Sequence, residues 1–120
     1  MANIVLIGVE KTIADQIRRA LAVDRHRIEQ KPGNTPVLDL TRADMIFAGG
    51  DPSQYLALLR LLRREKSTLP FVVVTSIPET TEWLNALEAG ATDYCSSPFE
   101  TRQIRWLMES ALPRYRIASA

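Results

Sequence analysis

The sequence predicts an α/β fold in which a five-stranded parallel sheet lies between two layers of helices. Short apolar segments bounded by Gly, Pro or charged residues recur along the chain, as is typical of strands that are covered on both faces. Helical patterns separate these segments, and strands that alternate with helices form right-handed crossovers in a parallel sheet. We therefore expect a three-layer sandwich with helices on both faces of the sheet.

Four segments have strong strand patterns, and a fifth pattern is weaker. The weaker one, residues 27–30, is expected at the edge of the sheet. The four strong segments are residues 3–8, 44–48, 70–75 and 92–95.

The first two clear helices have recognisable starts. Apolar residues recur at helical spacing behind Thr12, and Asp15 three residues later predicts a capping-box-like pair. The next helix is predicted to begin at Asp51-Pro52, with the aspartate as N-cap and the proline at the first helical position, and to end near Lys66. The buried positions expected in these helices are Ile13, Ile17, Ala20 and Leu21, and Tyr55, Leu58, Leu59 and Leu62.

Two further helices are amphipathic. The first is predicted to stop at Gly90 and the second at Pro113. We expect Trp83 in the core, because it falls inside the apolar arc of its helix. The apolar positions are Trp83, Leu84 and Leu87 in the first of these helices, and Ile104, Leu107, Met108 and Ala111 in the second.

The stretch 24–43 has the weakest pattern. Pro32, Gly33 and Pro36 interrupt it, and residues 37–40 have room for only about one turn of helix, so the second helix is predicted to be shortened.

The expected architecture is flavodoxin-like with strand order 2-1-3-4-5, and function in such a sheet lies at the carboxyl ends of the strands. Those ends are Gly8, Gly49, Thr75 and Ser96.

Composition narrows the class of protein. The 120 residues include 15 basic and 14 acidic ones, so no field of one sign favours direct nucleic-acid or membrane binding. The apolar runs are too short to span a membrane, no signal-peptide pattern is present, and the single cysteine suits a reducing compartment, so we expect a cytoplasmic protein. We predict one domain, residues 1–112, followed by a tail or the start of a linker, residues 113–120.

Two stretches resemble a known family. Residues 88–99, Glu-Ala-Gly-Ala-Thr-Asp-Tyr-Cys-Ser-Ser-Pro-Phe, are similar to the A-G-A-x-x-Y-x-x-K-P-F passage of the response-regulator receiver domain. Residues 69–76 resemble the family's proline, hydrophobic run and hydroxyl residue. The resemblance covers residues 3–112 and implies a role in two-component, phosphorelay signal transduction and in transcription regulation.

The positions that the family uses for phosphorylation differ in this chain. By resemblance, an active receiver has an acidic pair after its first strand for Mg²⁺, an aspartate after its third strand as phosphate acceptor, and a lysine before the Pro-Phe pair. The matching positions hold Gly8 and Val9, Gly49, and Ser97, whereas the switch positions Thr75 and Tyr94 are retained.

These substitutions predict a pseudo-receiver with a vacated phosphorylation pocket. Aspartyl phosphorylation needs a carboxylate, and Mg²⁺ needs oxygen ligands, which Gly and Val side chains do not supply. We expect no catalytic residue, no metal site and no cofactor, and hence no enzyme. Two acids leave an alternative open: Asp51 could accept phosphate and Glu10 could bind metal, although both residue types are ordinary at helix starts.

Trp106 indicates a contact surface. It lies nearly opposite the apolar stripe of its helix, and exposed Trp beside Arg is common at interfaces. By resemblance it lies on or near the face through which receivers dimerise or meet effectors. A second interpretation buries it under residues 113–120. The candidate interface residues are Arg102, Arg105, Trp106 and Glu109.

Two functional hypotheses follow. The first is a phosphorylation-independent signalling module that acts by protein contact, as a homodimer or with a partner protein or an attached effector domain. The alternative is a small-ligand or nucleotide sensor whose neutral crevice is formed by Gly8, Gly49, Thr75 and Ser97.

Overall fold

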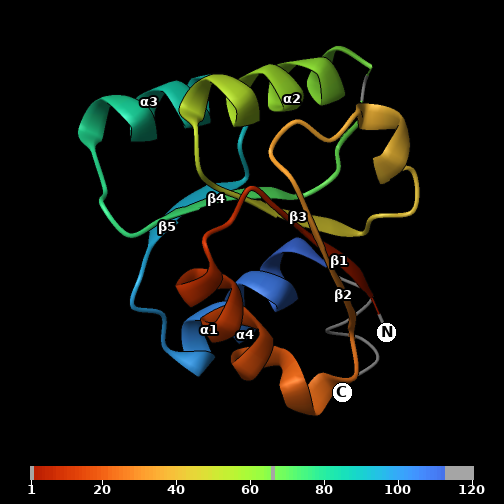
Figure 1. Cartoon of the computed structure of the whole chain (residues 1–120), viewed down its shortest axis with the longest axis vertical. Coiled ribbons are helices and arrows are strands. Elements are labelled where there is room, and N and C mark those ends of the chain that lie inside the picture. Colours follow the sequence, from red (N-terminus) through yellow and green to blue (C-terminus); the bar gives the residue numbers. More distant parts are fainter. Residues whose placement is uncertain (1, 66, 113–120) are drawn as a thin grey trace.

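The structure is a computed structural model that describes residues 2–65 and 67–112 (Figure 1). The five strands form one parallel sheet in the order β2-β1-β3-β4-β5, which confirms the predicted architecture. Figure 1 shows α1 and α4 on one face of the sheet and α2 and α3 on the other. The elements are β1 (Asn3–Ile7), α1 (Lys11–Leu21), η1 (Ala22–Asp24), β2 (Arg27–Lys31), η2 (Val37–Leu40), β3 (Met45–Ala48), α2 (Pro52–Arg64), β4 (Phe71–Thr75), α3 (Thr80–Glu88), β5 (Asp93–Ser96) and α4 (Thr101–Ala111).

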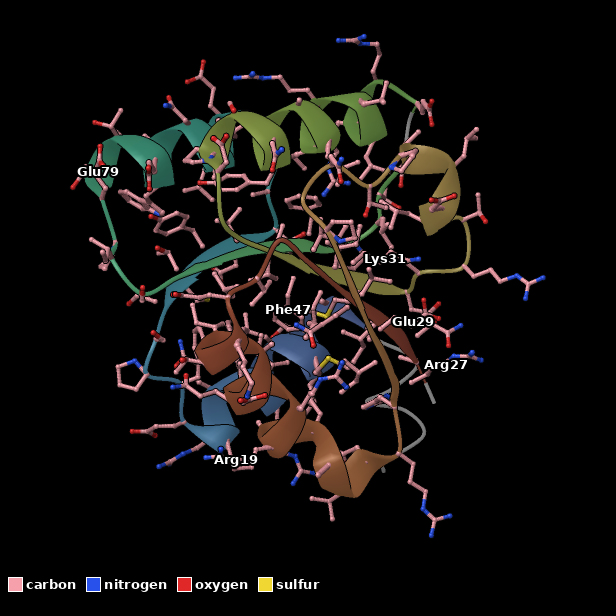
Figure 2. The ribbon with its side chains drawn as sticks, in the orientation of Figure 1. Arg19, Arg27, Glu29, Lys31, Phe47 and Glu79 are labelled. Carbon is pink, nitrogen blue, oxygen red and sulfur yellow. The ribbon has the colours of Figure 1, made fainter. Side chains whose placement is uncertain are left out.

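Two hydrophobic clusters join the three layers. Successive strand residues point to opposite faces, so Ile4 and Leu6 pack with α1 and α4, whereas Val5 and Ile7 pack with α2 and α3. Phe47, labelled in Figure 2, is fully buried in the first cluster. Burying one large apolar side chain contributes about 1.5–3 kcal/mol, and these clusters therefore hold the strand ends in fixed positions.

Helix α1 starts differently from the prediction. Glu10 is its N-cap residue and makes no side-chain capping bond, so the expected Thr12–Asp15 capping pair is wrong. Because the helix already begins at Lys11, Asp15 is its fifth residue and lies too deep to cap it. Asp15 instead accepts a hydrogen bond from Lys11, with 2.8 Å between Nζ and Oδ2.

Helix α2 starts as predicted. Asp51 is the N-cap, and its Oδ1 accepts hydrogen bonds from the backbone N–H and the hydroxyl of Ser53, each at 2.9 Å. Pro52 is the first helical residue, where the lack of an N–H costs nothing. The buried stripe is the expected one, Tyr55, Leu58, Leu59 and Leu62, and the helix ends at Arg64.

The predicted shortening of the second helix is confirmed. The connection between β2 and β3 contains the 3-10 turn η2 in place of an α-helix. Arg27, Glu29 and Lys31 lie on that side of β2, paired in register with Asn3, Val5 and Ile7 of β1 (Figure 2). Glu29 forms ion pairs with Arg27 at 3.4 Å and with Lys31 at 3.6 Å. Because its side chains are charged, this face of β2 can be in contact with solvent and does not need a covering helix.

Helix α3 contradicts one prediction. Trp83 is 42% exposed, and Leu84 and Leu87 are exposed beside it, so the expected core position of Trp83 is wrong. The buried residue of this helix is Ala86. With about 100° between successive residues, Ala86 lies to one side of the Trp83–Leu84–Leu87 arc. The small alanine therefore packs on the sheet, and the large apolar residues are turned outward.

Helix α4 follows its predicted pattern. Ile104, Leu107 and Met108 are buried against the sheet and α1. Trp106 is 59% exposed, as predicted. The predicted stop at Pro113 and the predicted tail, residues 113–120, lie outside the described residues. Among the described helices, none is long and apolar enough to cross a membrane.

Candidate functional site

The structure brings the predicted strand ends together. Gly49 follows β3, and its N–H donates to the carbonyl of Ile7 at the end of β1 (2.9 Å). On the other side of the sheet centre, Thr75 pairs in register with Ser96, and its carbonyl accepts a hydrogen bond from the N–H of Ser97 at 2.8 Å. The carboxyl ends of β1, β3, β4 and β5 therefore meet along one edge of the sheet.

The backbone is packed too tightly there for side chains. A Cβ atom at Gly49 would lie 2.8 Å from the carbonyl oxygen of Val74, and one at Gly8 would lie 2.8 Å from that of Gly49. A Cβ at Gly50 would lie 2.8 Å from the carbonyl oxygen of Gly8. Gly8 and Gly50 also have positive φ angles of 64° and 80°, which favour glycine. We refer to Gly8, Gly49 and Gly50 as the glycine cluster.

Neighbouring residues close the glycine cluster from two sides. Val9 packs toward the core cluster that α1 and α4 share. On the opposite side, the backbone of Gly33 lies 3.3 Å from where a Cβ of Gly8 would be, and the side chain of Gln54 occupies the space at Gly33. At the predicted pocket positions, backbone oxygens therefore lie beside Gly8 and Gly49, whereas Val9 contributes an apolar side chain.

The two residues at the predicted switch positions, Thr75 and Tyr94, make local hydrogen bonds. The Thr75 hydroxyl accepts from the N–H of Ile77 at 3.1 Å and lies 3.3 Å from the Ile77 carbonyl, to which it donates. The Tyr94 hydroxyl accepts from the N–H of Glu79 at 3.3 Å. Both hydroxyls therefore stabilise the loop between β4 and α3.

The two acids that could have replaced the missing ones lie at helix starts. Asp51 is engaged in capping α2, and Glu10 is exposed at the start of α1. Within residues 2–65 and 67–112, no three His, Cys, Asp or Glu side chains are grouped closely enough to hold a metal ion. The chemistry available at the strand ends is that of backbone amides, carbonyls and two hydroxyls.

Cys95 is unsuited to nucleophilic chemistry. Burial in β5 raises the pKa of its thiol to about 12, and the nearby Asp93 adds to the increase. The thiolate is the reactive form of cysteine. Cys95 is therefore an apolar packing residue of the core.

The four candidate interface residues of α4 have different surroundings. Arg105 is turned toward η1, where its guanidinium lies 3.4 Å from Asp24. Arg102 is highly exposed and lies 3.9 Å from Glu100. Trp106 is exposed on the side of α4 opposite the buried stripe, and Glu109 is partly buried. Of this set, Trp106 and Arg102 are the most accessible.

Sequence reasoning missed an exposed apolar surface on α3. It consists of Trp83, Leu84 and Leu87, and Ile77 in the preceding loop is also exposed. In a helix of nine residues the apolar arc is too short to indicate which way it faces, so no clear sequence signal was present.

Comparisons with known proteins agree with the fold. The chain matches no protein-family model. It is 27% identical, over its whole length, to the KDP operon transcriptional regulatory protein KdpE of Escherichia coli, of which it covers 55%. It is 34% identical, over 59% of its length, to the phosphate regulon transcriptional regulatory protein PhoB of Klebsiella pneumoniae, of which it covers 31%. The chain thus spans about half or less of these curated relatives.

A solved structure shows the same fold. The receiver domain of NtrX from Brucella abortus superposes with a TM-score of 0.77, at 20% identity, over 92% of this chain and 98% of that one. The homologues are response regulators, and the structural neighbours have the fold of their receiver domains.

Proposed function

We propose that this chain is a receiver-type module of response-regulator signalling that acts by protein contact and without aspartyl phosphorylation. The observation that carries the proposal is the glycine cluster, where carbonyl oxygens lie 2.8 Å from the positions that side chains would need. An acidic pocket requires several carboxylates around a cation. A Cβ atom added at Gly8, Gly49 or Gly50 would have to displace a carbonyl oxygen, which argues against carboxylates at these positions.

Mass spectrometry tests the absence of phosphorylation. After incubation with acetyl phosphate and Mg²⁺, the intact mass is expected to remain that of the unmodified chain. A phosphorylatable receiver treated in parallel serves as the positive control. If the chain gains a phosphoryl group and the Asp51→Ala variant does not, Asp51 is a phosphate acceptor and the proposal is wrong.

We propose that the protein contact is a homodimer in which two copies of the chain meet through α4. Trp106 presents a large aromatic ring to solvent, and Arg102 lies one turn earlier on the same helix. Exposed Trp and Arg are the residue types that carry most binding energy at interfaces. The relatives extend beyond the matched length, and an attached effector domain would receive the effect of this association.

Sedimentation measurements at increasing concentration test the homodimer. We expect a concentration-dependent dimer that Trp106→Ser weakens at least tenfold, in line with the loss of an interface hot spot of about 2 kcal/mol or more. Leu38→Ser is the matched control, because Leu38 is 78% exposed in η2, far from α4 in sequence. A chain that is monomeric at every concentration, or equal effects of the two substitutions, would contradict the homodimer.

The ligand-sensor alternative receives less support. Its crevice would lie at Gly8, Gly49, Thr75 and Ser97, where the backbone contacts leave no space for a Cβ at the two glycines. A thermal-shift screen with nucleotides and small anions distinguishes the alternatives, because a ligand that binds only the folded state raises the melting temperature. We expect no shift.

A further inference from the structure

A pocket apart from the glycine cluster lies between the start of α3 and β5. Its volume is about 410 Å³. The lining comprises two aromatic rings, one carboxylate, two hydroxyl groups and a proline, and it includes no basic residue. Figure 2 shows Glu79 at the outer end of α3. The lining residues are Pro78, Glu79, Thr80, Trp83, Tyr94 and Ser96.

Two backbone hydrogen bonds tie the aromatic residues to Glu79. The N–H of Trp83 donates to the carbonyl of Glu79 at 2.9 Å, and the side chains of both residues line the pocket. The Tyr94 hydroxyl accepts from the N–H of Glu79 at 3.3 Å. The indole, the phenol and the carboxylate are therefore gathered around the same end of α3.

The electrostatic surroundings favour a cation. Glu82 adds a second carboxylate in the first turn of α3, and the helix contains no basic residue. Burial raises the pKa of the nearby Tyr55 to about 12, and the charges of Glu82, Tyr94 and Glu79 contribute to that increase. The helix start carries a partial positive charge of about half a unit. The two full negative charges of Glu79 and Glu82 outweigh this partial positive charge. The Tyr94 hydroxyl also accepts a hydrogen bond from the N–H of Glu79 at the helix start.

We propose that this pocket binds the arginine side chain of a partner protein. A guanidinium stacks on Trp and Tyr faces by cation–π attraction, and its five N–H donors match the carboxylate of Glu79 and the hydroxyls of Thr80 and Ser96. A lysine ammonium is more strongly hydrated and lacks the planar shape. Trp83 remains accessible to a partner at 42% exposure.

This pocket lies on a different helix from the surface proposed for the homodimer, so the two proposals can be tested separately. Trp83 belongs to the layer of α2 and α3, whereas Trp106 belongs to the layer of α1 and α4 on the opposite face of the sheet (Figure 1). Loss of self-association in the Trp106→Ser variant would leave arginine binding unchanged. Failure of arginine binding would likewise leave the homodimer measurement unaffected.

The two tryptophans allow a direct test by NMR on the full chain. Trp83 and Trp106 each give one indole N–H resonance, so Trp106 serves as an internal reference. The probe is a capped peptide of alternating glycine and arginine. Its control replaces arginine with citrulline, which keeps the shape and removes the charge. We expect the arginine peptide to shift the Trp83 resonance saturably and the citrulline peptide to leave it unchanged.

Matched variants locate the binding. Glu79→Gln is expected to lower the affinity for the arginine peptide roughly three- to tenfold. Glu88→Gln, at the other end of α3, is expected to leave this affinity unchanged. Trp83→Leu is expected to abolish saturable binding, measured by fluorescence of a labelled peptide. Equal binding of the citrulline peptide, or equal weakening by the two Glu→Gln variants, would overturn the proposal. A Trp83 resonance that moves with protein concentration alone would assign the pocket to a second copy and also overturn it.

Discussion

At the residue scale, the glycine cluster combines the absence of acidic side chains with close packing of the backbone. The absence of acids at Gly8 and Gly49 is readable from the sequence once the strand ends are located. The sequence does not predict the distance of 2.8 Å between a Cβ atom at these positions and the nearest carbonyl oxygen. This distance depends on how the ends of β1, β3 and β4 pack against one another. The sequence therefore predicts which groups are missing, and in the structure a backbone oxygen lies close to where a Cβ atom would be at Gly8 and at Gly49.

Restoring the acceptor aspartate at residue 49 is expected to destabilise the protein without making it phosphorylatable. The new side chain meets the Val74 carbonyl, and overpacking of this kind costs about 1–3 kcal/mol. Urea denaturation measures the change in the free energy of unfolding for Gly49→Asp. Gly49→Ala adds the same Cβ without charge and is expected to show most of the loss. An alanine variant as stable as the natural chain would mean that the space is open.

His26 gives stability a predicted pH dependence. Its Nδ1 accepts a hydrogen bond from the N–H of Ala2 at 3.0 Å, which requires a neutral ring. Burial lowers the pKa of His26 from its ordinary 6.5, partly opposed by the charge of Asp24. The unfolded chain therefore binds more protons than the folded one just below pH 6.5, so stability falls as the pH drops through this range and levels off below the folded pKa.

Urea midpoints at pH 8 and at pH 5 measure this effect. The natural chain is expected to lose stability at the lower pH, and the His26→Gln variant is expected to lose less, because Gln does not titrate. Other groups also titrate across this range, so the difference between the two proteins is the relevant quantity. Identical pH profiles would show that His26 is not responsible.

At the scale of elements, helix starts were predictable where a side chain caps the helix. Asp51-Pro52 combines a capping acceptor with a residue that needs no N–H, and the structure has both roles. The start of α1 was less well predicted, because Glu10 serves as N-cap without a side-chain bond. The predicted orientation of α3 was wrong, since the buried residue of this helix is Ala86 and not the larger Trp83.

Asp51→Ala is expected to destabilise the protein by about 1 kcal/mol through the lost cap. Asp51→Asn is the matched control, because asparagine retains the capping acceptor and removes the charge and the possible phosphate acceptor. Chemical denaturation should show a loss for the alanine variant and nearly full stability for the asparagine variant. Equal losses would indicate that the charge of Asp51, and not its capping bond, stabilises α2.

At the scale of the whole molecule, the alternation of strands and helices predicted the parallel sheet, and the order 2-1-3-4-5 was the one expected for a flavodoxin-like fold. Continuous apolar strands required cover on both faces, and the weak stretch between β2 and β3 indicated where that cover is reduced. Which large residues remain exposed was harder to predict, because it depends on how each helix is rotated over the sheet. Trp106 and Trp83 are exposed on helices of opposite layers, so the two proposed contact sites use different helices.

Hydrogen exchange should reveal the uneven cover of the sheet. The amides of β1 and β3 lie between paired strands and two helical layers, so they are expected to exchange only on global unfolding. Those of β2 lie at the edge, where Arg27, Glu29 and Lys31 line one face and the 3-10 turn replaces a helix, so they should exchange through local opening at much faster rates. The experiment is run at two protein concentrations. Protection of β2 equal to that of β1 at the lower concentration would contradict this account, because it would mean that the edge strand opens only with the whole domain.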